Sequence, residues 1–169
     1  MSESLLTDRI KALLGRQLMD QAGKVRPVEK SQIERYCEAT ANMNPLYKDS
    51  DQARTGPYGG MIAPPTFFYA PFHIARGTLL PVPFGTDNPE VDELMKLFGT
   101  ARGLDIGEDI EFFTPIRPGD VLTYKRELTE ISEKRIKTGP AIHATATTTI
   151  TNQRGELVCE EKLHFFFFD

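Results

Sequence analysis

One segment constrains the fold of this chain more than any other: residues 61–75, MIAPPTFFYAPFHIA, are apolar almost throughout. Pro64 and Pro65 are typical of the first turn of a helix, which we expect to run to about Arg76. Pro71 lies inside this helix, where it removes one backbone hydrogen bond and bends the axis. A helix that is apolar on every side must be buried on every side. The rest of the chain therefore has to enclose it.

The C-terminal part of the chain supplies strands that can do so. Four segments alternate polar and apolar residues or are rich in β-branched and aromatic ones: residues 104–115, 121–132, 141–151 and 156–168. Turn-forming residues separate them, at Arg117-Pro118-Gly119-Asp120 and at Asn152-Gln153-Arg154-Gly155. The sequence predicts an α+β fold in which a curled antiparallel sheet wraps around the long central helix.

Further helices are predicted on both sides of the apolar segment. Apolar residues recur at three- and four-residue steps from Leu5 to Leu18, which predicts an amphipathic first helix. Ser31 and Glu34 have the spacing of a capping box and predict the start of a second helix. Two shorter helices should follow, one capped by Asp49 or Asp51 and ended by Gly56, the other running from Asn88-Pro89 to Gly99.

Composition fits a single domain over residues 1–169, with a helical extension at 1–27 and the core at 28–169. Hydrophobic residues make up 40% of the chain and charged residues 26%, which is ordinary for a globular protein.

The net charge is −4 and the 20 Lys and Arg are scattered, so we expect neither nucleic acid nor a membrane surface as partner. The N-terminus lacks the apolar centre of a signal peptide, and the apolar segment is shorter than the ~20 residues that span a bilayer. A cytoplasmic protein is expected.

The candidate ligands for a metal are few. Cys37 and Cys159 lie in apolar periodic segments, where two buried, reduced thiols are expected. His73, His143 and His164 are not at ligand spacing, and no cluster of acids accompanies them. We therefore expect no metal site, and the absence of a Gly-rich phosphate loop predicts no bound cofactor.

Four motifs, in order, carry a resemblance to a known family: ATANMNPLY, GGMIAPPTFF, FFTPIRPGDVLTYKRELTEIS and NQRGELV. They resemble the MaoC-like hydratases and dehydratases of the hot-dog fold, and more narrowly the N-terminal MaoC-like dehydratase branch. The resemblance covers about residues 28–168. It implies a reaction in which water adds across the double bond of an α,β-unsaturated acyl thioester, or the reverse.

That reaction needs an acid/base pair and a donor that holds the charge on the thioester oxygen. Active members resemble the pattern Gly-Asp-x-Asn-Pro-Leu-His, in which Asp and His are the pair. An Ile-Ala-His-Gly motif follows, and a backbone N–H there polarises the carbonyl. In this chain Asn42 takes the Asp position and Tyr47 the His position, while Pro64 and Pro65 replace the His and Gly of the second motif.

These departures remove the groups that do the chemistry. Asparagine has no ionisable group, and a tyrosine hydroxyl ordinarily titrates near pH 10, so neither serves readily as a base at about pH 7. Proline has no N–H, so Pro65 cannot donate to an oxyanion, and the loss of one such donor typically costs about 10²–10³ in rate. The resemblance therefore implies no catalytic residue on this chain.

In several MaoC-like enzymes a silent fold binds the acyl group while a paired fold does the chemistry. The resemblance thus predicts the substrate-binding subunit of a heteromeric enoyl-CoA hydratase or 3-hydroxyacyl-CoA dehydratase, with a catalytic MaoC-like hot-dog chain as partner. The IAPP sequence especially resembles silent halves associated with bulky, steroid-type acyl-CoA thioesters. The side chains expected to bind the substrate are Asn42, Tyr47, Pro64, Pro65, Thr66, Ala70 and His73.

Some residues allow two interpretations. Lys134, Arg135 and Lys137 precede Gly139-Pro140 in a hairpin, where they could meet CoA phosphates or simply be exposed. The acids Asp49, Asp51, Glu108 and Asp109 could replace the missing carboxylate, or could be a helix cap and a solvated strand end. Two other functions stay open: a homodimer that binds acyl thioesters without turnover, and an active homodimeric hydratase or thioesterase that uses Tyr47 with Asp49.

The sequence ends in four phenylalanines, residues 165–168. Because a strand alternates faces, Phe165 and Phe167 should lie on one face and Phe166 and Phe168 on the other. One pair can pack on the central helix. The second pair needs a cover too, which could be a subunit interface or the N-terminal helix folded over the sheet.

Overall fold

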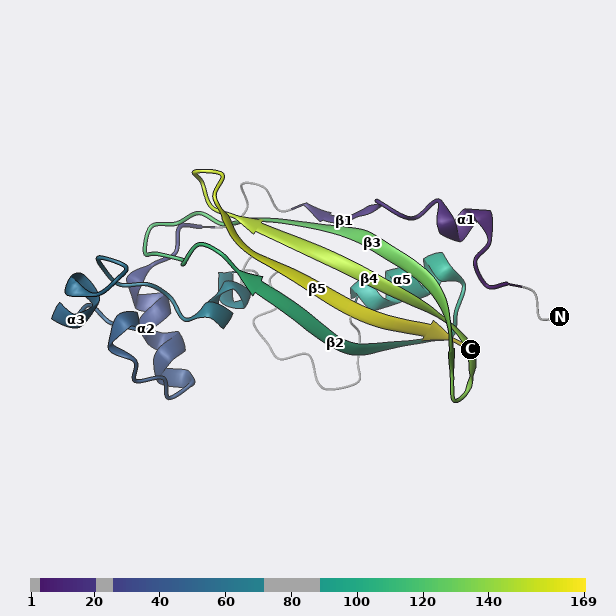
Figure 1. Cartoon of the computed structure of the whole chain (residues 1–169), viewed down its shortest axis with the longest axis horizontal. Helices are drawn as coiled ribbons and strands as arrows, with labels where there is room; N and C mark the ends of the chain where they lie inside the picture. Colours follow the sequence, from purple (N-terminus) through teal and green to yellow (C-terminus); the bar gives the residue numbers. More distant parts are fainter. Residues whose placement is uncertain (1–3, 21–25, 72–88) are drawn as a thin grey trace.

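The computed structural model of the protein describes residues 4–20, 26–71 and 89–169 (Figure 1). Five antiparallel strands form one twisted sheet in the order β1-β3-β4-β5-β2. Their bounds are β1 Gln17–Asp20, β2 Arg102–Phe112, β3 Thr123–Ile136, β4 Gly139–Thr151 and β5 Leu157–Phe168. The predicted α+β fold with a curled antiparallel sheet is confirmed.

The start of the predicted central helix is described and the rest of it is not. A 3-10 turn, η2, covers Pro65–Phe68, and helical backbone continues through residues 69–71. The hydroxyl of Tyr124 on β3 donates to the carbonyl of Phe68 at 2.7 Å, which fixes this turn against the sheet. The predicted bend after Pro71 and the end near Arg76 lie outside the described residues.

The prediction of a first helix from Leu5 to Leu18 is wrong in its second half. Helix α1 spans only Asp8–Lys11, after which the chain turns at Gly15 with a φ of 79°. Residues of β1 then pair with Lys125–Glu127 on β3. The backbone of Arg16 accepts from Leu128 at 3.0 Å, so pairing along the sheet edge replaces the helical hydrogen bonds. Part of the predicted extension therefore belongs to the sheet.

Helix caps differ from their predicted residues by one or two positions. Helix α2 spans Lys30–Ala39, and its box uses Glu29, whose N–H donates to the side chain of Gln32 at 2.9 Å, rather than Ser31 and Glu34. Helix α3 spans Asp51–Thr55 and is capped by Ser50, not by an aspartate. Helix α5, Pro89–Phe98, ends at Gly99 (φ 70°) as predicted.

The buried side chains form two clusters on one face of the sheet. Cluster 1 lies toward α2 and η2 and includes Ile33, Phe67 and Tyr124. Cluster 2 lies toward α1 and α5 and includes Phe165 and Phe167, which pack with the residues Ile10, Leu94 and Phe98. The predicted alternation of the four phenylalanines is confirmed, because Phe166 and Phe168 are only half-buried. Ile10 of α1 packs with Phe165 and Phe167, so the alternative that the N-terminal helix covers Phe166 and Phe168 is wrong.

Candidate functional site

A cavity of about 250 Å³ lies at the end of the sheet where β2 stops. It is lined by residues 46–47, 62–65 and 112–116, together with Tyr58 and Val158. Three segments far apart in the sequence thus meet at one site: the 3-10 turn η1 (Pro45–Tyr47), the segment before η2, and the end of β2.

Backbone hydrogen bonds hold these segments together. The N–H of Ile62 donates to the carbonyl of Leu46 at 3.1 Å, and the N–H of Ala63 donates to Ile116 at 2.8 Å. Asn44 caps η1 by accepting from the N–H of Leu46 at 3.0 Å. The two sequence motifs around residues 44 and 63 therefore build one wall of the cavity together.

The structure brings together only some of the predicted site residues. Tyr47, Pro64 and Pro65 line the cavity, whereas Asn42, Thr66 and Ala70 do not. His73 lies outside the described residues. The side chain of Asn42 instead accepts from the N–H of Asn44 at 3.2 Å, and so shapes the turn that carries Tyr47.

The described lining of the cavity contains few polar side chains. Among the described residues that border the cavity, no side chain carries a carboxylate, imidazole, thiol or amine. The two tyrosines and Thr114 are the polar ones. Pro64 and Pro65 add walls without backbone donors, so Thr66 is the first residue of this turn whose N–H could polarise a carbonyl.

Sequence reasoning missed the aromatic part of this wall. Tyr58, Phe112 and Phe113 line the cavity, and both phenylalanines are about half exposed, at 46% and 49%. The ring of Phe112 lies 6.2 Å from that of Phe68 in an edge-on arrangement. The only sequence signal was their place directly before the TPIRPGD motif.

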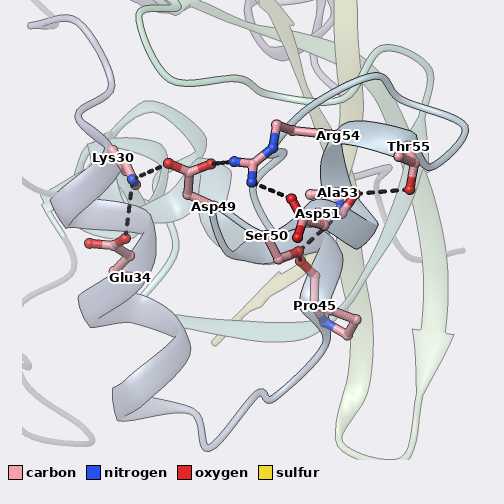
Figure 2. Close-up of polar contacts among 9 residues, drawn as sticks. All are labelled: Lys30, Glu34, Pro45, Asp49, Ser50, Asp51, Ala53, Arg54 and Thr55. Carbon is pink, nitrogen blue, oxygen red and sulfur yellow. Dashed lines mark hydrogen bonds and ion pairs between the residues drawn. The ribbon is translucent and has the colours of Figure 1, made fainter.

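Ion pairs fix the loop that carries Tyr47 (Figure 2). Asp49 accepts from Lys30 of α2 and from Arg54 of α3, both at 2.7 Å, and Arg54 also contacts Asp51 at 2.5 Å. The hydrogen bond from Lys30 lowers the pKa of Asp49 below its ordinary value, and Arg54 lowers it further. A carboxylate held between two cations is a weak base, which argues against Asp49 as a substitute catalyst.

Of the three remaining candidate carboxylates, Asp51 pairs with Arg54, whereas Glu108 and Asp109 contact neighbours away from the cavity. Asp109 lies 3.1 Å from His164 on β5. The hydroxyl of Tyr69, just after η2, contacts both Glu108 and Glu161, and burial raises the pKa of Tyr69 far above its ordinary value. Neither Asp109 nor Glu108 borders the cavity. These two residues are therefore poor replacements for the missing aspartate.

Glu161 belongs to a buried polar row that separates the two clusters. Arg126 on β3 donates to Glu161 on β5 at 2.7 Å and to Thr148 on β4 at 2.6 Å. The hydroxyl of Thr148 donates to the same carboxylate at 2.8 Å. The hydroxyl of Tyr69, which also contacts Glu108, lies 2.6 Å from the other oxygen of Glu161, so both carboxylate oxygens have a partner.

The basic residues proposed to meet CoA phosphates lie far from the cavity. Lys134 and Arg135 are in β3, and Lys137 is in the two-residue turn that leads to β4. Lys134 pairs with Ala141, whereas the cavity borders the far end of β4, near Ile150. Nine residues of strand separate these levels, which is about 30 Å. Within one chain these side chains therefore cannot reach a ligand in the cavity.

Two histidines meet on the face of the sheet away from the clusters. The rings of His143 and His164 stack 5.8 Å apart, a proximity that their sequence spacing does not indicate.

Throughout residues 4–20, 26–71 and 89–169, no three His, Cys, Asp or Glu side chains form a group that could hold a metal. Over the same residues, no helix is long and apolar enough to cross a membrane.

A family model described as the FAS1-like dehydratase domain region matches residues 12–161. The chain belongs to this family of dehydratase domains. The resemblance to MaoC-like proteins and the hot-dog fold is thereby confirmed.

Known relatives agree with this assignment. A probable enoyl-CoA hydratase alpha subunit from Thermomonospora curvata is 27% identical over 95% of this chain and 51% of its own length. The chain spans about half the length of the curated relatives it matches.

Two solved structures share the hot-dog fold. The ChsH1-ChsH2 complex from Mycobacterium tuberculosis has a TM-score of 0.67 at 20% identity, covering 85% of this chain and 79% of the matched one. A MaoC-like dehydratase from Rhodospirillum rubrum has a TM-score of 0.63 at 21% identity, covering 92% of each chain. This FAS1-like dehydratase domain therefore places its cavity within a fold that hydratases and dehydratases use.

Proposed function

We propose that this MaoC-like chain is the substrate-binding, catalytically silent fold of an enoyl-CoA hydratase or 3-hydroxyacyl-CoA dehydratase. A second hot-dog chain would supply the acid/base pair. One observation carries the proposal: the cavity formed by the family motifs is lined without any carboxylate, imidazole, thiol or amine among the described residues.

Addition of water to an enoyl thioester requires a base for the water and an acid for the α-carbon. Asn42 cannot ionise, and its side chain is engaged in the turn before η1. Pro64 and Pro65 give the thioester oxygen no backbone donor where active members have one. The described part of the chain thus retains walls of the site without the groups that move protons.

The retained walls suit an acyl group. Ile62, Ala63 and Phe112 offer apolar surface, and Tyr47 offers a hydroxyl at the border. The volume of about 250 Å³ is below the usual range of about 300–1,000 Å³ for ligand sites, so the described residues enclose only part of a thioester. A second chain would complete the pocket.

The acyl group we favour is bulky and of the steroid type, carried by CoA. The choice rests on the IAPP sequence, residues 62–65, which resembles silent halves associated with such thioesters; Ala70 packs against cluster 1 and does not border the cavity. The likeness to one chain of the ChsH1-ChsH2 complex and to a hydratase alpha subunit supports a two-chain assembly. Binding by calorimetry, with the partner present, should favour a polycyclic acyl-CoA over butyryl-CoA.

The decisive experiment measures hydration of a crotonyl-type thioester by the purified chain, alone and with a second hot-dog chain. The second chain is one that carries Gly-Asp-x-Asn-Pro-x-His, sought first in a neighbouring gene. Alone, the protein should stay far below an ordinary kcat of about 10 s⁻¹. The mixture should turn over, and Asp→Asn in the partner's motif should abolish that activity.

The matched control changes this chain instead. Tyr47→Phe should raise the KM of the mixture rather than lower its kcat, because Tyr47 lines the cavity and in this proposal moves no proton. Robust turnover by the pure chain that is lost in Tyr47→Phe or Asp49→Asn would favour an active homodimer and contradict the proposal.

A further inference from the structure

A second hollow, an open groove of about 530 Å³, lies far from the cavity. It is lined by residues of two segments, 4–10 around the start of α1 and 97–99 at the end of α5. In Figure 1, α1 lies toward the end of the sheet opposite α2 and α3. Gly99 of the groove precedes β2 and Phe113 of the cavity follows it, so about 30 Å of strand separates the two sites.

Contacts on both sides keep the groove open. The hydroxyl of Ser4 donates to Glu133 on β3 at 2.8 Å, which fixes the segment before α1. On the other side, the ring of Phe98 lies 4.9 Å from that of Phe167 on β5. Gly99 is at the border, and apart from its chain neighbours no heavy atom lies within 4 Å of where a Cβ would stand. The space beside α5 is therefore free for a ligand.

The walls of the groove are mostly apolar. Ile10 and Phe98 are buried members of cluster 2, and Leu5 and Leu97 pack against that cluster while they also border the groove. Apolar surface of this kind binds hydrocarbon, because contact removes apolar area on both sides from water. The volume lies within the usual range of about 300–1,000 Å³ for sites that take small ligands.

One cation stands at this apolar groove. Among the described residues that border it, Arg9 is the only charged one, and its side chain is exposed. No hydrogen bond or ion pair joins the guanidinium of Arg9 to another residue in the described part of the chain. By contrast, Lys11 lies 3.8 Å from Asp8, and Arg16 lies 3.3 Å from Glu93. A free guanidinium can bind a carboxylate through two parallel hydrogen bonds.

Two negative groups limit where an anion can lie. The last carbonyls of α5 act as roughly half a negative charge at the end of that helix. Glu133, which accepts from Ser4, adds a full negative charge near the same border. A carboxylate should therefore lie against Arg9, with its hydrocarbon along Leu97 and Phe98.

We propose that this groove binds a fatty acid as its carboxylate, with the head group on Arg9 and the hydrocarbon chain against α1 and α5. The site goes beyond the proposed function and does not rest on it. Because the groove and the cavity are separate, a free acid and an acyl thioester can occupy the same chain at the same time.

The first test compares head groups and chain lengths on the wild type by calorimetry at about pH 7.5, where a fatty acid is ionised. The probes are octanoate, decanoate and decyltrimethylammonium. Decanoate should bind more tightly than octanoate, by up to about fourfold for each added methylene. The ammonium compound has the same decyl chain and the opposite charge, and should bind at least about tenfold more weakly than decanoate.

The second test changes the cation. Arg9→Gln should weaken decanoate binding about tenfold, and Arg9→Glu should reverse the preference, so that decyltrimethylammonium binds better than decanoate. The controls Lys11→Gln and Lys11→Glu make the same charge changes at an exposed position of the same helix that does not border the groove. They should keep the wild-type preference for decanoate.

Amide shifts in NMR spectra locate the bound acid. Decanoate should shift the amides of Ile10 and of residues 97–100, and leave those of Thr114 and Val158 at the cavity unchanged. Shifts confined to the cavity, or equal binding of decanoate and the ammonium compound by the wild type, would overturn the proposal. So would an Arg9→Glu variant that folds, by circular dichroism, and still prefers decanoate. If that variant does not fold, Arg9→Gln and the wild-type measurements decide.

Discussion

Arg126 and Glu161 form an ion pair of 2.7 Å in the interior of the protein, with only 5% and 1% of their side chains exposed. The pair joins β3 to β5 across Thr148 of β4, and Tyr69 reaches it from the start of the central helix. Strands β3, β4 and β5 and the residue that follows η2 therefore all contact this ion pair. The pair, with Tyr69, fixes which part of the sheet lies beneath η2 and residue 69.

Removing one member of the pair should be strongly destabilising. Arg126→Met leaves the carboxylate of Glu161 buried without its counter-charge, and we expect a loss of about 3–5 kcal/mol in the free energy of unfolding. The double change Arg126→Met with Glu161→Leu removes both charges and should recover much of that loss. Urea unfolding of the three proteins measures this. A cost below about 1 kcal/mol for Arg126→Met would show that the pair is not needed for the fold.

His143 should make stability depend on pH. Burial lowers the pKa of His143 below its ordinary value of 6.5; Glu130 opposes this shift, while His164 and Lys134 add to it. The unfolded chain therefore takes up the proton first as the pH falls below 6.5, so stability falls between that pH and the lower pKa of the folded state. His143→Gln should reduce the loss in urea midpoint between about pH 7.5 and 5.5. An equal or larger loss in the variant would contradict the assignment.

The two cysteines should be unreactive in the folded protein. Burial raises the pKa of Cys159 to about 12, with a further contribution from Glu161, and burial raises the pKa of Cys37 too. At pH 8 only about one Cys159 in 10⁴ is then a thiolate, the reactive form. A disulfide reagent should modify both thiols in urea, and at least about tenfold more slowly without it. Fast modification of the native protein would show that these thiols are accessible.

Much of the fold follows from local pattern. Strands β3, β4 and β5 were predictable because one face of each packs on the clusters and the other does not, which produces alternation; β2 is exposed along most of its length. Helix α5 was predictable from its proline and glycine. Strand β1 was not, because Gln17–Asp20 has no strand pattern of its own and becomes a strand by pairing with β3. The N-cap of α2 was predicted at the wrong residue because two overlapping pairs, Glu29 with Gln32 and Ser31 with Glu34, have the spacing of a capping box.

The candidate site was only partly predictable. Tyr47, Pro64 and Pro65 were identified by resemblance, and the structure places all three at the cavity. Phe112 and Phe113 could not be found because they reach the cavity only when β2 pairs with β5 in the observed register. The pairing of His143 with His164 likewise depends on strand register, which sequence spacing does not reveal.

Restoring the acid/base pair alone should not restore catalysis. Asn42→Asp with Tyr47→His replaces the missing groups, but Pro65 still presents no N–H to the thioester oxygen. Acid/base assistance is typically worth ~10²–10⁴ in rate and needs a polarised carbonyl beside it. Asn42 also does not border the cavity, so an aspartate there starts from a poor position. We expect little hydration of a crotonyl-type thioester by the double variant.

A measurable rise is expected only when Pro64→His and Pro65→Gly are added, because the quadruple variant regains a backbone donor at the start of η2. The loss of Pro65 also removes a residue suited to the first turn of a helix, so circular dichroism must first show that the variant folds. The control adds only Pro64→His to the double variant; it keeps Pro65 and should stay near the double variant's rate. If the double variant already approaches an ordinary kcat of about 10 s⁻¹, the donor at position 65 is not what this chain lacks.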